Sequence, residues 1–319
     1  MVSGNFNVEN SIERAIDFLY QRQLPWGEFK SLACWNPWLL GSYFDSSPFI
    51  TSFVLYSLKD IRNERVKIMT EKAINFLLSE QEKGGIWRFW TKRNKKRIPP
   101  DLDDISTISF ILKLNKVNFD DNLQLILNNR NKDNLFLTFI IDREEKYHFA
   151  SLIDKFKEEI DGVVNANVLL YLGQNDPAVC SFINWAIKSN QPCSIYYPSR
   201  LALFYTVSRA FKNNVTALGE NKELIIKSTL SYQKKPGVFT SDLDAALALN
   251  TLFNFDYTGK EINLGINYLL KRQLANGSWR KSFLFLGPFP WRYYGSEELT
   301  TALVIEAMKN YSYFYGKNL

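Results

Sequence analysis

The apolar residues of this 319-residue chain recur mostly at spacings of three and four, which is the period of an α-helix. The stretches 11–22 and 71–80 are apolar on one face only. Other stretches are apolar almost all round: 48–58, 101–114, 161–172, 198–211, 241–253 and 296–308. Alternation with a period of two is nearly absent. The pattern therefore predicts an all-α fold with an outer and an inner layer of helices.

A short sequence repeat closes four of the expected outer helices. It consists of a glutamine, a glycine four residues later and an aromatic residue two further on, and it starts at Gln23, Gln81, Gln233 and Gln273. A degenerate copy starts at Gln191, with Ile195 in the glycine position and Tyr197 in the aromatic position. One more unit fits around 122–143, where 135–141 has the character of an extended or buried run. Six units in a ring make a single α/α barrel (a toroid of helical hairpins), which we expect to span residues 1–319 as one domain.

Three carboxylates mark the start of the second expected inner helix. Two prolines precede Asp101, Asp103 and Asp104. Asp101 is suited to cap the helix, and Asp104 occupies the position of the reciprocal acid in a capping box. Neither role explains Asp103. Repulsion among the three favours a retained proton, and the helix N-terminus stabilises the anion left when that proton departs. Asp103 is therefore a candidate Brønsted acid, with simple helix capping as the alternative for the cluster.

The six inner helices of such a barrel run parallel, so their N-termini meet at one rim. This places polar groups and aromatic rings from distant segments around one mouth. We take as candidate substrate-binding residues Trp38, Phe49, Asn165, Asn167, Tyr196, Tyr197, Arg200, Asp242, Trp291, Tyr294 and Glu297. Helix caps and ordinary packing are the alternatives for each. The apolar segment 283–291 is expected to line the mouth or to touch a membrane.

Composition narrows the possible partners. The net charge of +6 is mild and spread out, so nucleic acid is not an expected partner. One basic cluster stands apart and consists of Lys92, Arg93, Lys95, Lys96 and Arg97. It is either a solvated loop or a surface for an anionic group or a membrane. The N-terminus has no signal-peptide pattern, and the three cysteines lack metal-ligand spacing. We therefore expect a cytoplasmic protein, soluble or peripherally attached to a membrane.

The repeats and the aspartate cluster together resemble the class II terpene cyclases, a group of α/α-barrel isoprenoid enzymes that includes the squalene–hopene cyclases. Residues 101–104 look like their Asp-x-Asp-Asp motif, and the four repeat copies look like their glutamine–tryptophan repeats. Ile105 departs from the threonine usual in the family. The chain has room for one barrel only, as in the small cyclases, some of which make meroterpenoids from prenylated aromatic acids.

The resemblance implies a protonation-initiated cyclisation of a linear polyprenyl substrate, with Asp103 as the acid beside Asp101 and Asp104. It implies no metal and no cofactor, except magnesium if the substrate carries a diphosphate. In some relatives a histidine orients the acid, and His148 is the only histidine here. Two other functions remain open: a non-catalytic barrel that binds isoprenoids or lipids, and a carbohydrate-active barrel that pairs Asp103 with Glu297 or Asp242. Substrate length, head group and oligomeric state are left open.

Overall fold

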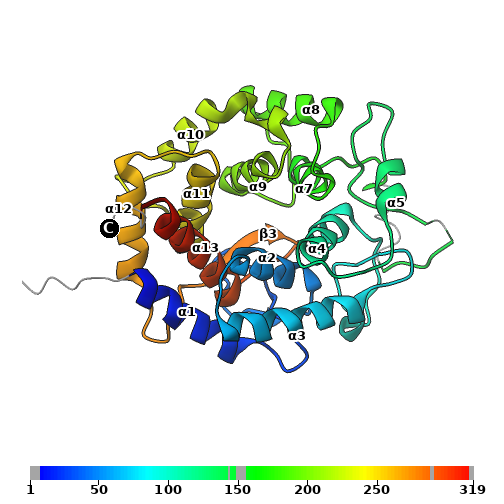
Figure 1. Ribbon diagram of the computed structural model, residues 1–319. Coiled ribbons are helices and arrows are strands. Elements are labelled where there is room, and N and C mark those ends of the chain that lie inside the picture. The colour runs from blue at the N-terminus through cyan, green and yellow to red at the C-terminus, as the bar shows by residue number, and fades with distance from the viewer. Residues whose placement is uncertain (1–7, 143, 149–155, 288–290, 316–319) are drawn as a thin grey trace, which may run out of the picture.

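Six inner helices form a closed ring (Figure 1). The computed structural model describes residues 8–142, 144–148, 156–287 and 291–315. Each inner helix packs against the next one along the chain, and the last packs against the first. The inner helices are α2 (Pro48–Leu58), α4 (Leu102–Leu114), α7 (Gly162–Leu172), α9 (Arg200–Lys212), α11 (Asp242–Asn254) and α13 (Glu297–Tyr315).

A second layer of helices surrounds this ring (Figure 1). It comprises α1 (Val8–Arg22), α3 (Glu64–Glu80), α5 (Leu123–Asn128), α8 (Pro177–Lys188), α10 (Lys222–Ser231) and α12 (Lys260–Arg272), with short 3₁₀ turns at Lys92–Asn94 and Thr216–Asn221. The predicted α/α barrel of six hairpins is confirmed. The third helix of the outer layer, α5, is short. The run after it is extended, with isolated bridges that pair Arg130 with Phe136 and Asp101 with Phe139.

Side-chain caps define where the inner helices begin. The Ser47 hydroxyl accepts from the amide of Phe49, and Pro48 supplies the fixed φ that suits a first helical turn. The Asp101 carboxylate accepts from the Asp104 amide at 2.8 Å. Because these helices are buried on all sides, their length follows the caps rather than an amphipathic pattern. The predicted bounds of α2 agree with the structure, whereas α13 runs to Tyr315 instead of 308.

The repeat turns hold neighbouring outer helices together. Gln23 donates from Nε2 to the carbonyl of Gly27 at 2.9 Å and to that of Met69, in α3, at 2.8 Å. Gln273 does the same with Gly277 and with Ser11 in α1, which closes the outer layer. Gly277 has φ +90°, and a Cβ there would lie 2.3 Å from the carbonyl oxygen of Arg14. A side chain at this position would therefore separate α12 from α1.

A small sheet covers the rim at which the inner helices begin, and its strands were not predicted. It contains β1 (Leu32–Cys34), β2 (Tyr43–Phe44), β3 (Ser282–Leu286) and β4 (Tyr293–Ser296), antiparallel in the order β2-β1-β4-β3. Strands of two to five residues are too short to give a periodic signal, so the all-α prediction holds although these strands are present. Since β4 leads directly into α13, the sheet lies beside the expected site.

Two further sequence expectations concern the chain as a whole. No helix among the described residues has both the length and the apolar character needed to cross a bilayer. Cys34, Cys180 and Cys193 are all unpaired thiols.

Candidate active site

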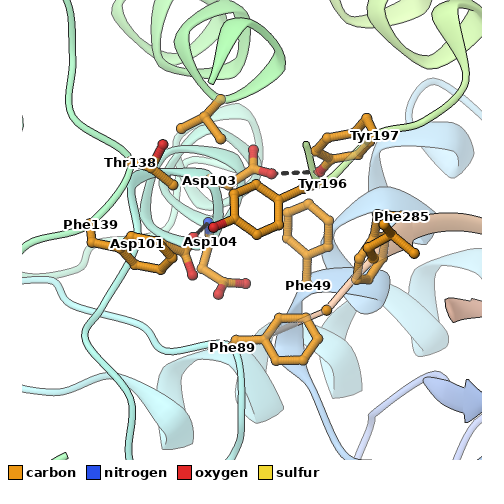
Figure 2. Close-up of a pocket in the computed structure, with 13 residues that line it drawn as sticks. Phe49, Phe89, Asp101, Asp103, Asp104, Thr138, Phe139, Tyr196, Tyr197 and Phe285 are labelled. Carbon is orange, nitrogen blue, oxygen red and sulfur yellow. Dashed lines mark hydrogen bonds between the residues drawn. The ribbon is translucent and has the colours of Figure 1, made fainter. Parts of the chain in front are cut away.

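A pocket opens at the rim where the inner helices begin (Figure 2). The pocket is narrow, with a cavity volume of about 50 Å³. Its walls are largely aromatic and aliphatic, and the polar groups are concentrated in the aspartate cluster. The lining residues are Phe49, Phe89, Asp101, Asp103, Asp104, Thr138, Phe139, Val164, Tyr196, Tyr197, Phe285, Leu286 and Gly287.

Asp103 is held by donors from two other inner segments. Its Oδ2 accepts from the hydroxyl of Tyr197 at 2.5 Å, as Figure 2 shows, and its Oδ1 accepts from Nδ2 of Asn167 at 2.7 Å. Burial raises the pKa of Asp103 to about 7, and the charge of Asp101 adds to the rise. The two hydrogen bonds act in the opposite direction, because they stabilise the carboxylate. The side chain can therefore hold a proton near neutral pH. When it releases that proton, the two hydrogen bonds stabilise the carboxylate that remains.

A buried arginine fixes the amide that contacts Asp103. The Arg209 guanidinium donates to Oδ1 of Asn167 at 2.8 Å, so the amide must present Nδ2 to the aspartate. Arg209 is only 2% exposed and lies against the rings of Phe53, Tyr56 and Tyr205, at 4.7–4.8 Å from their centroids. This places a positive charge behind Asn167, on the far side from the pocket.

Asp101 and Asp104 differ from Asp103 in their contacts. Asp101 caps α4, as predicted, and burial raises its pKa. Asp104 is 1% exposed, and its two carboxyl oxygens have no hydrogen-bond partner among the described residues. The expected reciprocal capping bond from Asp104 is therefore not formed. Burial and the neighbouring charge of Asp101 raise the pKa of Asp104 well above its ordinary value.

A second acid lies beside the pocket wall and was not predicted. Glu159 accepts from the hydroxyl of Tyr196 at 2.8 Å, and burial raises its pKa to about 7. Tyr196 lines the pocket, and its ring lies 5.6 Å from that of Trp291. Glu159 belongs to an irregular segment with no periodic pattern, so nothing in the sequence singled it out.

The opposite wall is a cluster of aromatic rings. Phe285 meets Phe49 edge-on at 5.1 Å and stacks on Tyr294 at 5.5 Å. Phe89 meets Tyr294 edge-on at 5.0 Å. The Tyr294 hydroxyl donates to Oδ2 of Asp45 at 2.6 Å, which fixes its ring beneath the pocket wall. In Figure 2, Phe49, Phe89 and Phe285 stand across the space from the three carboxyl groups.

The structure brings together some of the residues selected from the sequence. Phe49, Tyr196 and Tyr197 line the pocket with the aspartates, Asn167 bonds to Asp103, and Tyr294 supports the wall. Trp291 lies at the margin through its contact with Tyr196. The segment 285–287 lines the pocket, as expected of the apolar stretch 283–291, and residues 288–290 lie outside the described part of the chain.

Other selected residues lie elsewhere, and the lining does not include them. Asn165 bonds to both backbone groups of Phe136 and so anchors the extended run. Arg200 donates to the carbonyls of Gln191 and Ile187, near the outer helix α8. Trp38 is 71% exposed at the end of a loop. These three were selected because they lie near helix starts, but proximity to a helix start does not define the direction of a side chain.

Two acids proposed as partners of Asp103 are also absent from the pocket lining, and so is the histidine. Asp242 is buried in an ion pair with Arg272, and Glu297 begins α13 without contributing to the lining. His148 is exposed and accepts from the amide of Arg97 at its Nδ1. The paired-carboxylate arrangement of a carbohydrate-active site is therefore not formed by these residues, and Asn167 and Tyr197 hold Asp103 in place of a histidine.

Several lining residues escaped sequence reasoning. Phe89, Thr138 and Phe139 come from loops, and Val164 comes from the first turn of α7. Phe285, by contrast, belongs to the apolar stretch 283–291 that was expected to line the mouth. A local signal for Arg209 does exist, since it is a charged residue that ends the apolar run of α9 and is itself buried.

The fold and its rim pocket define the structural class: the chain has the α/α-barrel fold of the type II terpene cyclases. The type II terpene cyclase MstE from Scytonema, solved as a variant in complex with geranylgeranyl dihydroxybenzoate (substrate), has a TM-score of 0.77 at 14% identity, over 95% of this chain and 97% of that one. A protein from Actinoplanes has a TM-score of 0.76 at 16% identity, over 95% and 99% of the two chains.

A larger cyclase contains a similar barrel. ent-Copalyl diphosphate synthase from Streptomyces platensis matches 82% of this chain and 50% of its own, with a TM-score of 0.57 at 15% identity. A family model for the A-macroglobulin TED domain matches residues 3–92, which is less than half of the chain and assigns no family. No curated protein matches the sequence. At these identities the likeness establishes the fold, and the function has to be argued from the site.

Proposed function

We propose that this protein is a class II, protonation-initiated terpene or meroterpenoid cyclase with Asp103 as the Brønsted acid. The main support for this proposal is the environment of the Asp103 carboxyl group. This group faces an apolar, aromatic pocket and has a pKa of about 7. It is also held by two donors that stabilise its anion. Helix capping requires none of this, because Asp101 makes the cap.

The proposed reaction begins with proton transfer. A carboxylic acid gives its proton to the terminal double bond or epoxide of a folded polyprenyl chain, and a tertiary carbocation forms. The π electrons of successive double bonds attack this centre and form the rings, until a base removes a proton from the last cation. One proton is gained and one is lost, so a substrate that begins as an alkene gives a product that is its isomer. Tyr197 and Asn167 stabilise the Asp103 anion at the first step.

The walls of the pocket suit the cations that follow. A carbocation needs stabilisation without a nucleophile nearby, and aromatic faces supply about 2 kcal/mol each when desolvated. The rings of Phe49, Phe89 and Phe285 provide such faces opposite the acid. The apolar lining also limits access of water, which would otherwise quench the cation early.

The same pocket indicates the substrate class. We expect a small-molecule polyprenyl substrate, because a flexible hydrocarbon chain matches the apolar lining. The similarity of the fold to MstE makes a prenylated dihydroxybenzoate the first compound to test. We expect the reaction to need no metal or other cofactor, because a carboxylic acid supplies the proton. Magnesium enters only if the head group is a diphosphate.

An isotope experiment tests the proposal directly. The protein is incubated with geranylgeranyl dihydroxybenzoate in D₂O, and the product is analysed by mass spectrometry. Initiation by protonation gives a cyclic isomer that carries one deuterium, whereas the same reaction in H₂O leaves the mass unchanged. Asp103→Asn should give no product in either solvent. Cyclic product without deuterium would contradict the role of Asp103 as an acid that exchanges with solvent.

The two alternative functions give different outcomes in the same assay. A non-catalytic isoprenoid carrier would retain the compound on the protein and return it unchanged. A carbohydrate-active enzyme would ignore it and cleave oligosaccharides instead. The structure offers no second carboxylate opposite Asp103 from Asp242 or Glu297, so no specific observation favours the latter.

A further inference from the structure

The loop between β1 and β2 exposes an unusual set of apolar side chains. Trp35, Trp38 and Leu40 are 65%, 71% and 69% exposed, and Tyr43 and Phe44 on the edge strand β2 are also exposed. All five belong to the ten-residue stretch 35–44. Scattered single apolar residues on a surface need no explanation, but a contiguous group of this kind marks an interaction surface. We call these five residues the aromatic tip.

The loop that carries the aromatic tip is held in a defined conformation. The side-chain amide of Asn36 donates to the carbonyl of Leu40 at 2.8 Å and accepts from its amide at 3.1 Å. Leu39, between the two most exposed residues, is fully buried and has φ +54°. A left-handed backbone is unfavourable for leucine, so buried contacts must compensate for it. The loop is therefore anchored by Leu39 while Trp38 and Leu40 are held outward.

Positive charge surrounds this tip. The Arg292 guanidinium lies over the ring of Trp35, and Lys281 donates to the hydroxyl of Ser42 within the loop. The basic cluster found in the sequence lies close to the tip, because Asn94, which interrupts that cluster, donates to Asp45, the residue after Phe44. The lysines and arginines of this cluster are exposed, but Arg97 is already ion-paired with Glu82 and Glu145, so Lys92, Arg93, Lys95 and Lys96 supply the free charge. Tryptophan next to lysine and arginine is the composition of protein surfaces that enter the interface of an anionic bilayer.

The tip is also continuous with the pocket wall. Cys34, next to Trp35, pairs with Tyr293 of β4. Arg292, which covers Trp35, accepts at its carbonyl from the amide of Gly287, a residue of the pocket lining. A water-insoluble molecule that leaves a bilayer at the tip would therefore meet the pocket wall within the same sheet.

We propose that the aromatic tip and the adjoining basic cluster dock this protein on the surface of an anionic lipid bilayer. Trp35, Trp38 and Leu40 enter the boundary between head groups and acyl chains, and the basic cluster contacts anionic head groups. The binding is peripheral and reversible, since a few apolar side chains in the interface are far from a membrane span. The docking does not depend on the proposed reaction and holds whatever the pocket binds.

Vesicle sedimentation tests this proposal with the full chain. Vesicles of phosphatidylcholine mixed with phosphatidylglycerol should bind the protein, and vesicles of phosphatidylcholine alone should bind it much less. The double variant Trp38→Ser with Leu40→Ser should lose at least about tenfold in partition. The control is Trp185→Ser, which removes a tryptophan that is 58% exposed on α8 and should leave binding unchanged.

A charge variant separates the two components. Lys95→Asn with Lys96→Gln should weaken binding to anionic vesicles by about fivefold for each charge removed, and added salt should reduce this difference. Asparagine suits the left-handed backbone at Lys95, where φ is +52°, so folding is preserved. Thermal melting of each variant verifies that it is folded.

Three results would overturn the proposal. The first is a parent protein that binds neither kind of vesicle. The second is equal binding by the tip variant and the Trp185→Ser control. The third is a dimer in light scattering that Trp38→Ser with Leu40→Ser converts to a monomer, because the tip would then be an interface between copies of the chain.

Discussion

Arg209 donates to the carbonyl oxygen of the Asn167 side chain, and this bond decides which end of the amide faces Asp103. If the amide were reversed, two hydrogen-bond acceptors would face each other, and the anion of the acid would lose a donor. The arginine never reaches the pocket lining, yet it sets the polarity of a group that does. It acts as a positioning residue within the proposed mechanism.

The first prediction separates chemistry from helix capping. Asp103→Asn should fold normally, since the amide has the same shape and relieves the burial of an ionisable group. Product formation should fall by several orders of magnitude, because an amide has no acidic proton to transfer. Asp101→Ala is the comparison: it removes the bond to the Asp104 amide and should lower the free energy of unfolding by about 1 kcal/mol. Thermal melting and product formation measured on both variants distinguish the two roles, and a cyclising Asp103→Asn protein would return the cluster to capping.

The second prediction follows from the raised pKa of Asp103. The folded protein retains this proton up to about pH 7, whereas the unfolded chain loses it near its ordinary value of 3.8. Folded protein thus binds more protons between these values, and the contribution of Asp103 to stability, fully present at low pH, is lost as pH rises through this window. The loss is at most roughly 4 kcal/mol. Denaturant unfolding at several pH values should show Asp103→Asn gaining stability relative to the parent as pH rises. A constant difference across the window would mean that the pKa is not raised.

The third prediction concerns the tyrosine that contacts the acid. Tyr197→Phe keeps the ring against Phe285 and removes only the donor to Oδ2 of Asp103. Loss of one preorganised donor to an anion costs about 10²-fold in kcat. The pKa of Asp103 should rise, since this bond lowers it, and the alkaline limb of the pH–rate profile should move to higher pH. A normal pH profile with reduced kcat would indicate a packing role instead.

The fourth prediction tests Arg209. Arg209→Met keeps an unbranched side chain among the rings but frees the Asn167 amide to rotate. The acid then loses a fixed donor and a nearby positive charge, so kcat should fall about tenfold or more while KM changes little. The alkaline limb should again shift upward, because the anion is less stabilised. Combining Arg209→Met with Asn167→Ala should cost little more than Asn167→Ala alone, since both act through one amide. If the losses in kcat of the two single variants add up in the double variant, Arg209 does not act through Asn167.

The fifth prediction measures how much the close contact between the Gly277 turn and α1 contributes to stability. Gly277→Ala and Gly84→Ala both place a side chain on a left-handed backbone, at φ +90° and +82°. A Cβ at Gly84 meets nothing within 4 Å, whereas at Gly277 it meets the Arg14 carbonyl. Gly84→Ala should cost only the backbone strain, about 1–2 kcal/mol. Gly277→Ala should cost clearly more, as measured by denaturant unfolding. Equal costs would show that the turn can move away from α1 without penalty.

Much of the barrel could be predicted because its signals are local. The caps at Ser47 and Asp101 fix where helices begin, and the glutamine repeats mark where the outer helices end. The short strands could not be predicted, because β1 and β4 come from opposite ends of the chain and exist only once the ring has closed.

The residues of the candidate site also fall into those with a local signal in the sequence and those without one. Asp103 could be singled out from the sequence because helix capping explains Asp101 and Asp104 but leaves the third charge without a structural role. Arg200 and Asp242 were selected because they lie near helix starts, but their side chains turn to Ile187 and Arg272. Arg209 was missed because its importance depends on Asn167, 42 residues earlier and on another helix. Long-range pairings of this kind have no local signature.

The closure of the ring between α13 and α2, and between Gln273 and Ser11, also constrains how the chain acquires its structure. Those last contacts join segments 262 residues apart, so they carry a large entropy of loop closure. During synthesis the first five inner helices can pack one after another as they emerge, but the curved array stays open until α13 is complete. The aromatic wall from β3 and β4 lies near the end of the chain, so the pocket around Asp103 cannot be complete before that segment has been made.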